Sequence, residues 1–141
     1  MRKIALRLIA VLLALTTVLV AGCAWRAPFN QYSFDETARL KAESTALLHK
    51  ADRSYALSAR KVEALTVNVY KAYEDSRLRA LNEESMRVWL VLLDAQQESL
   101  AGALNRWKLN DTLSAEERRE FQQRIAQNFD DISKLEGEKK R

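Results

Sequence analysis

The segment HKADRS, residues 49–54, decides how many helices this chain forms. It lies within a stretch from Ser33 to Arg79 that contains neither glycine nor proline, and apolar or small residues recur through that stretch at helical spacing. A single helix from residue 34 to residue 79 would be ~68 Å long. A break at residues 49–54 would instead fold the first part of the stretch back against the second.

Two further helices are expected after this stretch. The second begins at Asn82 and ends near Lys108, and the third opens with a capping box, Ser114 to Glu117, and ends at Gly137, which suits a helix C-cap. The third helix carries apolar residues at helical spacing, namely Phe121, Ile125, Phe129, Ile132 and Leu135. We therefore predict an all-α fold, an antiparallel bundle of three helices with a long first helix, or of four if that helix breaks.

The two alternatives differ in what covers the first part of the long stretch. If the first helix is unbroken, the second and third helices, ~39 and ~33 Å long, lie along its C-terminal half. Residues 34–52 then carry an uncovered apolar stripe, and such a stripe usually marks an interface with a second copy or another protein. If the helix breaks, the chain covers this stripe itself. The stripe includes Leu40, Leu47, Leu48 and Ala51.

The amino-terminal residues have the layout of a secretory signal. Arg2, Lys3 and Arg7 precede an apolar run of 14 residues, Leu8 to Ala21, whereas a membrane-spanning helix needs about 20. A permanent transmembrane anchor is the weaker interpretation for this reason.

The run ends in Val20-Ala21-Gly22-Cys23. This sequence resembles the bacterial lipobox: a branched apolar residue, a small residue, Gly or Ala, and then Cys. The resemblance implies that residues 1–22 are a signal peptide cleaved between Gly22 and Cys23, and that the Cys23 thiol forms a thioether with a diacylglycerol. The alternative is a chance cysteine after an ordinary signal.

The same resemblance implies a location in the cell envelope. Two or three acyl chains on Cys23 would give stable anchoring, which a single chain does not. The next residue is Ala24 rather than Asp, and the sorting rule of two-membrane bacteria then implies the periplasmic face of the outer membrane. Residues 23–33 would form the lipidated cysteine and a short tether, residues 34–136 the bundle and residues 137–141 a polar tail. Trp25 and Phe29 would either rest among lipid headgroups or begin the fold.

Composition argues against a nucleic-acid partner. Three of the 23 Lys and Arg residues lie in the signal, which leaves 20 against 19 Asp and Glu, with both signs interspersed. Cys23 is the only cysteine, so no disulfide forms within the chain.

The residue pattern gives little support to catalysis. His49 is the only histidine, and together with Asp52 it supplies two metal ligands, too few for a zinc site. The carboxylates at Asp130 and Asp131, like the cluster of Glu116, Glu117 and Glu120, fit solvated helix faces. We expect no catalytic residue, metal or cofactor.

These observations favour a membrane-anchored, non-catalytic interaction or scaffolding module of the cell envelope, whose partner is another envelope protein or a second copy. The alternative is a structural lipoprotein of the coiled-coil type that links the outer membrane to peptidoglycan. A long first helix and lysines near the C-terminus favour it, and the Trp- and Phe-rich core and the terminal Arg141 disfavour it. The least supported alternative is a carrier of small apolar ligands or an enzyme. Either would need a pocket beside Trp89 or Trp107.

Overall fold

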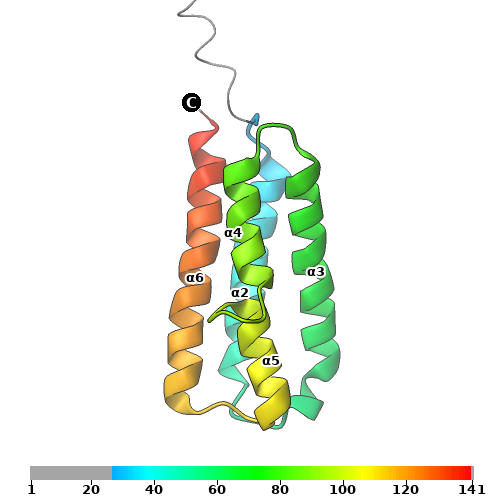
Figure 1. The fold of residues 1–141 in the computed structure, drawn as a ribbon, viewed down its shortest axis with the longest axis vertical. Helices are drawn as coiled ribbons and strands as arrows, with labels where there is room; N and C mark the ends of the chain where they lie inside the picture. The colour runs from blue at the N-terminus through cyan, green and yellow to red at the C-terminus, as the bar shows by residue number, and fades with distance from the viewer. Residues whose placement is uncertain (1–26, 141) are drawn as a thin grey trace, which may run out of the picture.

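A computed structural model describes residues 27–140 and confirms the all-α prediction for them (Figure 1). Their five α-helices, with one short 3-10 helix (η1), are α2 (Gln31–His49), η1 (Tyr55–Leu57), α3 (Ala59–Leu78), α4 (Glu83–Leu93), α5 (Leu100–Asn110) and α6 (Ala115–Glu138).

The helices form an antiparallel four-column bundle in which α4 and α5 together make one column (Figure 1). Neighbouring columns pack as α2 with α3, α3 with α4, α4 with α6, and α6 with α2. The described chain enters the bundle at the end where α6 also finishes (Figure 1). We call this the entry end, and the opposite end, where α3 begins and α5 finishes, the far end.

The prediction of a long first helix is wrong, because the helix ends at His49 and α3 begins only at Ala59. In addition to local turns, the intervening loop is hydrogen-bonded to the turn between α5 and α6. The backbone N–H of Leu113 donates to the carbonyl of Ala51 at 2.7 Å, and that of Tyr55 donates to the Asp111 carbonyl at 2.9 Å and carboxylate at 3.0 Å. These tertiary bonds replace the helical ones that the break removes.

The break also corrects the predicted partner interface. Because α2 folds back along α3 and α6, its apolar stripe lies inside the bundle: Leu40, Leu48 and Ala51 are 0% exposed and Leu47 is 5% exposed. All four belong to the hydrophobic core, so the chain covers the stripe itself, as in the four-helix alternative.

The second predicted helix is interrupted at residues 94–99, which form a loop that projects from the bundle (Figure 1). Ser99 donates its hydroxyl to the carbonyl of Asp94 at 2.5 Å and accepts from the backbone N–H of Gly102 at 3.1 Å as the N-cap of α5. A Cβ at position 102 would lie 1.9 Å from the carbonyl oxygen of Gln97. Only glycine therefore lets this loop pack against the first turn of α5.

The ends of the other helices follow the sequence with small differences. The predicted capping box at Ser114 and Glu117 is present, and α4 begins directly after Asn82. The first helix begins at Gln31, three positions before the expected residue 34, because Asn30 is its N-cap, and α6 continues through Gly137. Phe121, Ile125, Phe129 and Ile132 are buried in the core, as their spacing predicted, whereas Leu135 is only half-buried.

Within the described part of the chain, no helix combines the length and apolarity that a membrane span requires.

Candidate functional site

The predicted lipidation and cleavage residues, Cys23 and Gly22, lie outside the residues that the structure describes. The first described residue is Ala27, four positions after Cys23, and it is 2% exposed. Its backbone N–H donates to the carbonyl of Leu81, in the loop between α3 and α4, at 3.0 Å. The segment expected to be a tether is therefore already part of the fold at residue 27, four residues before α2 begins.

A buried ionic cluster lies at the entry end and centres on Glu136 of α6, whose side chain is 2% exposed. Its carboxylate accepts hydrogen bonds from Arg79 at 3.1 Å, from Ser85 at 3.1 Å and from Lys139 at 2.5 Å. Lys139 also donates to Ser85 at 3.1 Å and to the amide oxygen of Asn82. Two cations and a hydroxyl thus compensate the buried carboxylate, and the cluster joins α3, α4 and α6.

Arg79 extends this cluster to the incoming chain. Its guanidinium donates to the carbonyl of Pro28 at 2.6 Å and to the hydroxyl of Ser33 at 3.3 Å, in addition to Glu136. One side chain therefore connects residues 27–30 and α2 to the C-terminal turn of α6. A guanidinium suits this role because it presents several donors in one plane.

An aromatic pair completes the attachment of the incoming chain. The rings of Phe29 and Phe34 lie 6.1 Å apart, and the Lys140 ammonium lies 4.4 Å from the centre of the first ring and 5.0 Å from that of the second. These are cation–π distances. Phe29 thus belongs to the fold, which agrees with the second alternative considered for it from the sequence.

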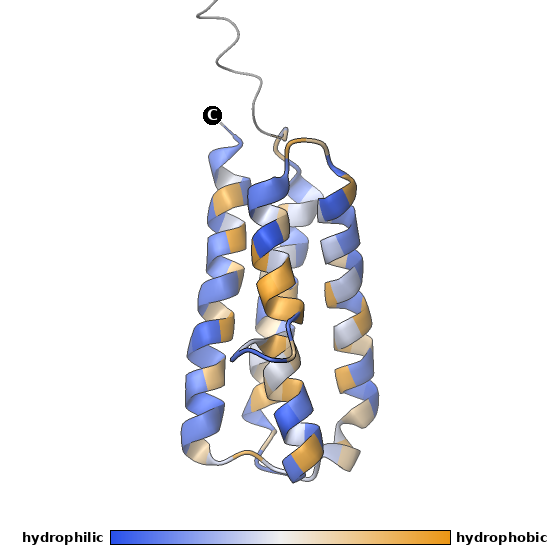
Figure 2. Cartoon of the chain, in the orientation of Figure 1, coloured by the Kyte–Doolittle hydropathy of each residue, from blue (hydrophilic) through white to orange (hydrophobic). Residues whose placement is uncertain are grey.

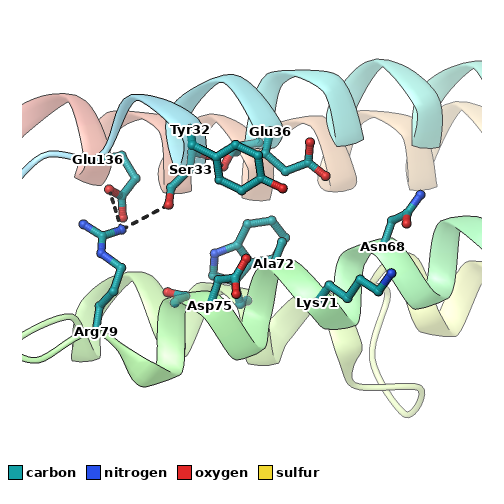
Figure 3. Close-up of a pocket in the computed structure, with 12 residues that line it drawn as sticks. Tyr32, Ser33, Glu36, Asn68, Lys71, Ala72, Asp75, Arg79 and Glu136 are labelled. Carbon is teal, nitrogen blue, oxygen red and sulfur yellow. Dashed lines mark hydrogen bonds and ion pairs between the residues drawn. The ribbon is translucent and has the colours of Figure 1, made fainter.

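A cleft of about 170 Å³ opens beside the ionic cluster, between α2 and α3 (Figure 3). Trp89 of α4 contributes to its lining, and Glu136 and Arg79 lie at one end. The charged side chains along its walls include both signs, Glu36 and Asp75 as well as Lys71. A cleft of this size and lining suits water or a small polar group. It contains no histidine that could activate a serine, because His49 is exposed at the other end of α2.

Glu36 at this cleft is kept ionised by its neighbour on α2. The Arg39 guanidinium donates to the Glu36 carboxylate at 2.8 and 2.6 Å, and this hydrogen bonding lowers the pKa of Glu36 and raises that of Arg39. A carboxylate held in its charged form in this way is a poor general acid.

The other polar residues considered from the sequence are spread over the surface. Asp130 pairs with Lys41 at 2.6 Å, and Glu117 caps α6. Asp52 lies 3.8 Å from Arg118. Among residues 27–140, no three His, Cys, Asp or Glu side chains come together as metal ligands.

The two tryptophans considered for an apolar pocket are both buried. Trp107 is 0% exposed and donates its indole N–H to the carbonyl of Arg53 at 3.0 Å. Trp89 is 4% exposed and packs edge-on against Phe129, with their ring centres 5.9 Å apart. Their principal role is therefore in the core.

Sequence reasoning missed two exposed apolar surfaces. One is at the entry end, where Leu78 is 74% and Leu81 45% exposed. The other is a set of exposed apolar side chains on the neighbouring helices α3 and α4, which we call the α3–α4 face; it comprises Val67, Tyr70, Leu90 and Val91, between 37% and 53% exposed. In the sequence these residues are hard to distinguish from core positions, because each lies among the apolar residues of its helix.

The described residues thus form an all-α bundle with an ionic cluster at the end where the chain enters. No family model matches this sequence, and no curated protein or solved structure matches it.

Proposed function

We propose that this chain is a lipid-anchored lipoprotein of the bacterial cell envelope, in which the helical bundle serves as a non-catalytic module that binds or positions another envelope protein. The observation that carries the proposal is the lipobox-like Val20-Ala21-Gly22-Cys23 at the end of a signal-like segment. The lipid on Cys23 would hold the mature chain at the periplasmic face of the outer membrane.

The distance between Cys23 and the bundle supports a module that works close to the membrane. Ala27 lies four positions after Cys23, and a fully extended chain of that length spans at most ~14 Å. Because Ala27 is bonded to the loop between α3 and α4, the anchor would hold the entry end, rather than the far end, near the lipid headgroups.

The surface of the bundle supports a binding role. The α3–α4 face combines exposed aliphatic and aromatic side chains from two helices that pack together. Hydrophobic positions are coloured along both of these helices in Figure 2. Clustered apolar residues on a protein surface are frequent at protein–protein contacts. We propose this face as the contact surface for the envelope partner.

Metabolic labelling with an alkyne-bearing fatty acid tests the anchor. The wild-type chain is expected to carry the label and to fractionate with membranes. Cys23→Ser is expected to lose the label and to persist as an unprocessed precursor, because a hydroxyl does not replace the thiolate as the nucleophile. Ala24→Asp is a matched control, which should keep the label but move to the inner-membrane fraction. Undiminished label on Cys23→Ser would contradict the proposal.

Site-specific photocrosslinking in intact cells tests the binding face. A photoreactive residue at Val67 or Leu90 is expected to give discrete crosslinked products. The same residue at Glu120, an exposed position on α6, serves as control and should give none. Identical crosslinking patterns from all three positions would contradict the assignment of the α3–α4 face.

A further inference from the structure

Two leucines at the junction of α3 and α4 are exposed to solvent at the entry end. Leu78 is the last residue of α3, and Leu81 lies three residues later, directly before the α4 N-cap. Their exposed fractions are 74% and 45%. Neither contributes appreciably to the core, so their apolar side chains are available for another surface.

The backbone at Leu81 is unusual for such a residue. Its φ angle is 61°, in the left-handed region that glycine and asparagine adopt most readily. A leucine here lowers the stability of the bundle and gains little burial in return. Residues held in such conformations concentrate at functional sites, where the side chain or the geometry is required.

The same loop is the point to which the incoming chain is bonded. The carbonyl of Leu81 accepts the hydrogen bond from Ala27, and Arg79 in this loop donates to Pro28. With Cys23 four residues before Ala27, the two leucines would lie within one short span of a lipid anchor, at most ~14 Å of extended chain.

The charges around the leucines are mixed. Arg77 and Lys140 are exposed cations near this end, and Glu83 and Glu84 are exposed carboxylates in the first turn of α4. The attraction of these cations to anionic lipid is therefore largely cancelled by the carboxylates. The apolar side chains then make the main remaining contribution to membrane binding.

From this placement we infer that the entry end docks against the lipid headgroup layer, with Leu78 and Leu81 inserted into the membrane interface and the bundle standing upright on it. This inference rests on the lipid anchor of the proposed function. Upright docking leaves the α3–α4 face open to the periplasm, and it places the far end ~30 Å from the interface, the length of α3.

Depth-dependent fluorescence quenching on the full-length lipoprotein tests this inference. Leu78→Cys and Leu81→Cys are labelled with an environment-sensitive thiol probe after reconstitution into phosphatidylethanolamine–phosphatidylglycerol vesicles that contain brominated lipids. Leu57→Cys and Leu109→Cys at the far end are matched controls, since these side chains are 77% and 76% exposed. Val67, on the α3–α4 face, is 48% exposed. A probe on Val67→Cys would be quenched if the bundle lay with this face on the membrane.

We expect quenching at positions 78 and 81 to exceed that at 57, 67 and 109 several-fold, and to change little with the fraction of phosphatidylglycerol. Equal quenching at all five positions would overturn the inference, as would quenching at 67 that matches quenching at 81. Probes at positions 78 and 81 could instead be shielded from solvent in native membranes but remain unquenched in vesicles that contain no other protein. That result would assign the leucines to a protein partner and would also overturn the inference.

The wild-type chain separates this inference from the proposed function. A Cys23 sulfur held in a thioether cannot react with the probe, so wild-type protein should remain unlabelled. A labelled wild type would show that Cys23 is not lipidated, and both the proposed function and the inference would fail. An unlabelled, vesicle-bound wild type with no quenching at 78 and 81 would overturn the inference alone.

Discussion

Replacement of Glu136 by alanine should destabilise the bundle more than the replacement of any exposed carboxylate on α6. The Glu136 side chain is 2% exposed, and those of its partners Arg79 and Lys139 are 17% and 6% exposed. Glu136→Ala therefore leaves two largely buried cations without their shared carboxylate, and the removal of one partner from a buried ion pair costs about 3–5 kcal/mol. That is a large share of the roughly 5–15 kcal/mol that stabilises a typical domain.

Urea unfolding of residues 24–141, followed by far-UV circular dichroism, measures this loss. Glu120→Ala, which removes an exposed carboxylate from the same helix, should change the free energy of unfolding by no more than about 0.5 kcal/mol. Glu136→Gln keeps the shape and one acceptor, so we expect an intermediate loss. A value for Glu136→Ala within error of that for Glu120→Ala would refute the account of the entry end as an ionic cluster that holds the helices together.

Three further predictions concern the loop, the core and the α6 cap. Leu81→Gly should stabilise the bundle by about 1 kcal/mol in the same unfolding assay, because glycine adopts a positive φ without the steric cost that leucine meets; a loss of stability would show that the exposed leucine is structurally required. Phe129→Ala should cost about 3–5 kcal/mol, since the ring is fully buried against Trp89; a change below 1 kcal/mol would place it outside the core. The Ser114 backbone N–H donates to Glu117 at 2.8 Å and lowers the pKa of that carboxyl, so ionised Glu117 stabilises the fold above its unfolded pKa and the contribution is lost as pH falls through the folded pKa. Glu117→Gln should accordingly be less stable than wild type at pH 7, and the difference in the free energy of unfolding should vanish at a pH below the folded pKa. An equal difference at pH 7 and at that low pH would contradict a stabilising role of ionised Glu117.

Local sequence signals predicted the parts of the fold that local interactions determine. The capping box at Ser114, the start of α4 after Asn82 and the buried spacing from Phe121 to Ile132 are features of single helices. The sequence shows each of them directly, because a helix cap and an amphipathic face depend on residues within a few positions of each other.

The breaks between helices depend on distant residues, and the sequence pattern left them open or missed them. Ala51 and Tyr55 can lie outside a helix because residues more than 50 positions later satisfy their backbone groups. Leu113 bonds to the carbonyl of Ala51, and Asp111 bonds to the N–H of Tyr55. The loop at residues 94–99 has a clearer local signal, since Ser99 and Gly102 have the spacing of an N-cap and a close-approach glycine. That signal was obscured by the apolar residues on both sides, which continue a helical stripe in the sequence.

The entry end was harder still to predict. Glu136 is followed by Gly137 and a charged tail, a context typical of an exposed helix end. Its burial becomes visible only when α3, α4 and α6 are assembled, because Arg79 and Ser85 are more than 50 positions away in the chain. The location of the chain in the envelope, by contrast, is a prediction from residues 1–24 alone.

Mass spectrometry of the amino-terminal peptide, from protein isolated from native membranes, shows whether Cys23 is the lipidated first residue of the mature chain. We predict that the mature chain begins at Cys23 and that this residue carries a diacylglyceryl thioether, with a further acyl chain on its amino group. A peptide that runs through Ala21-Gly22-Cys23-Ala24 with an unmodified cysteine would contradict the account.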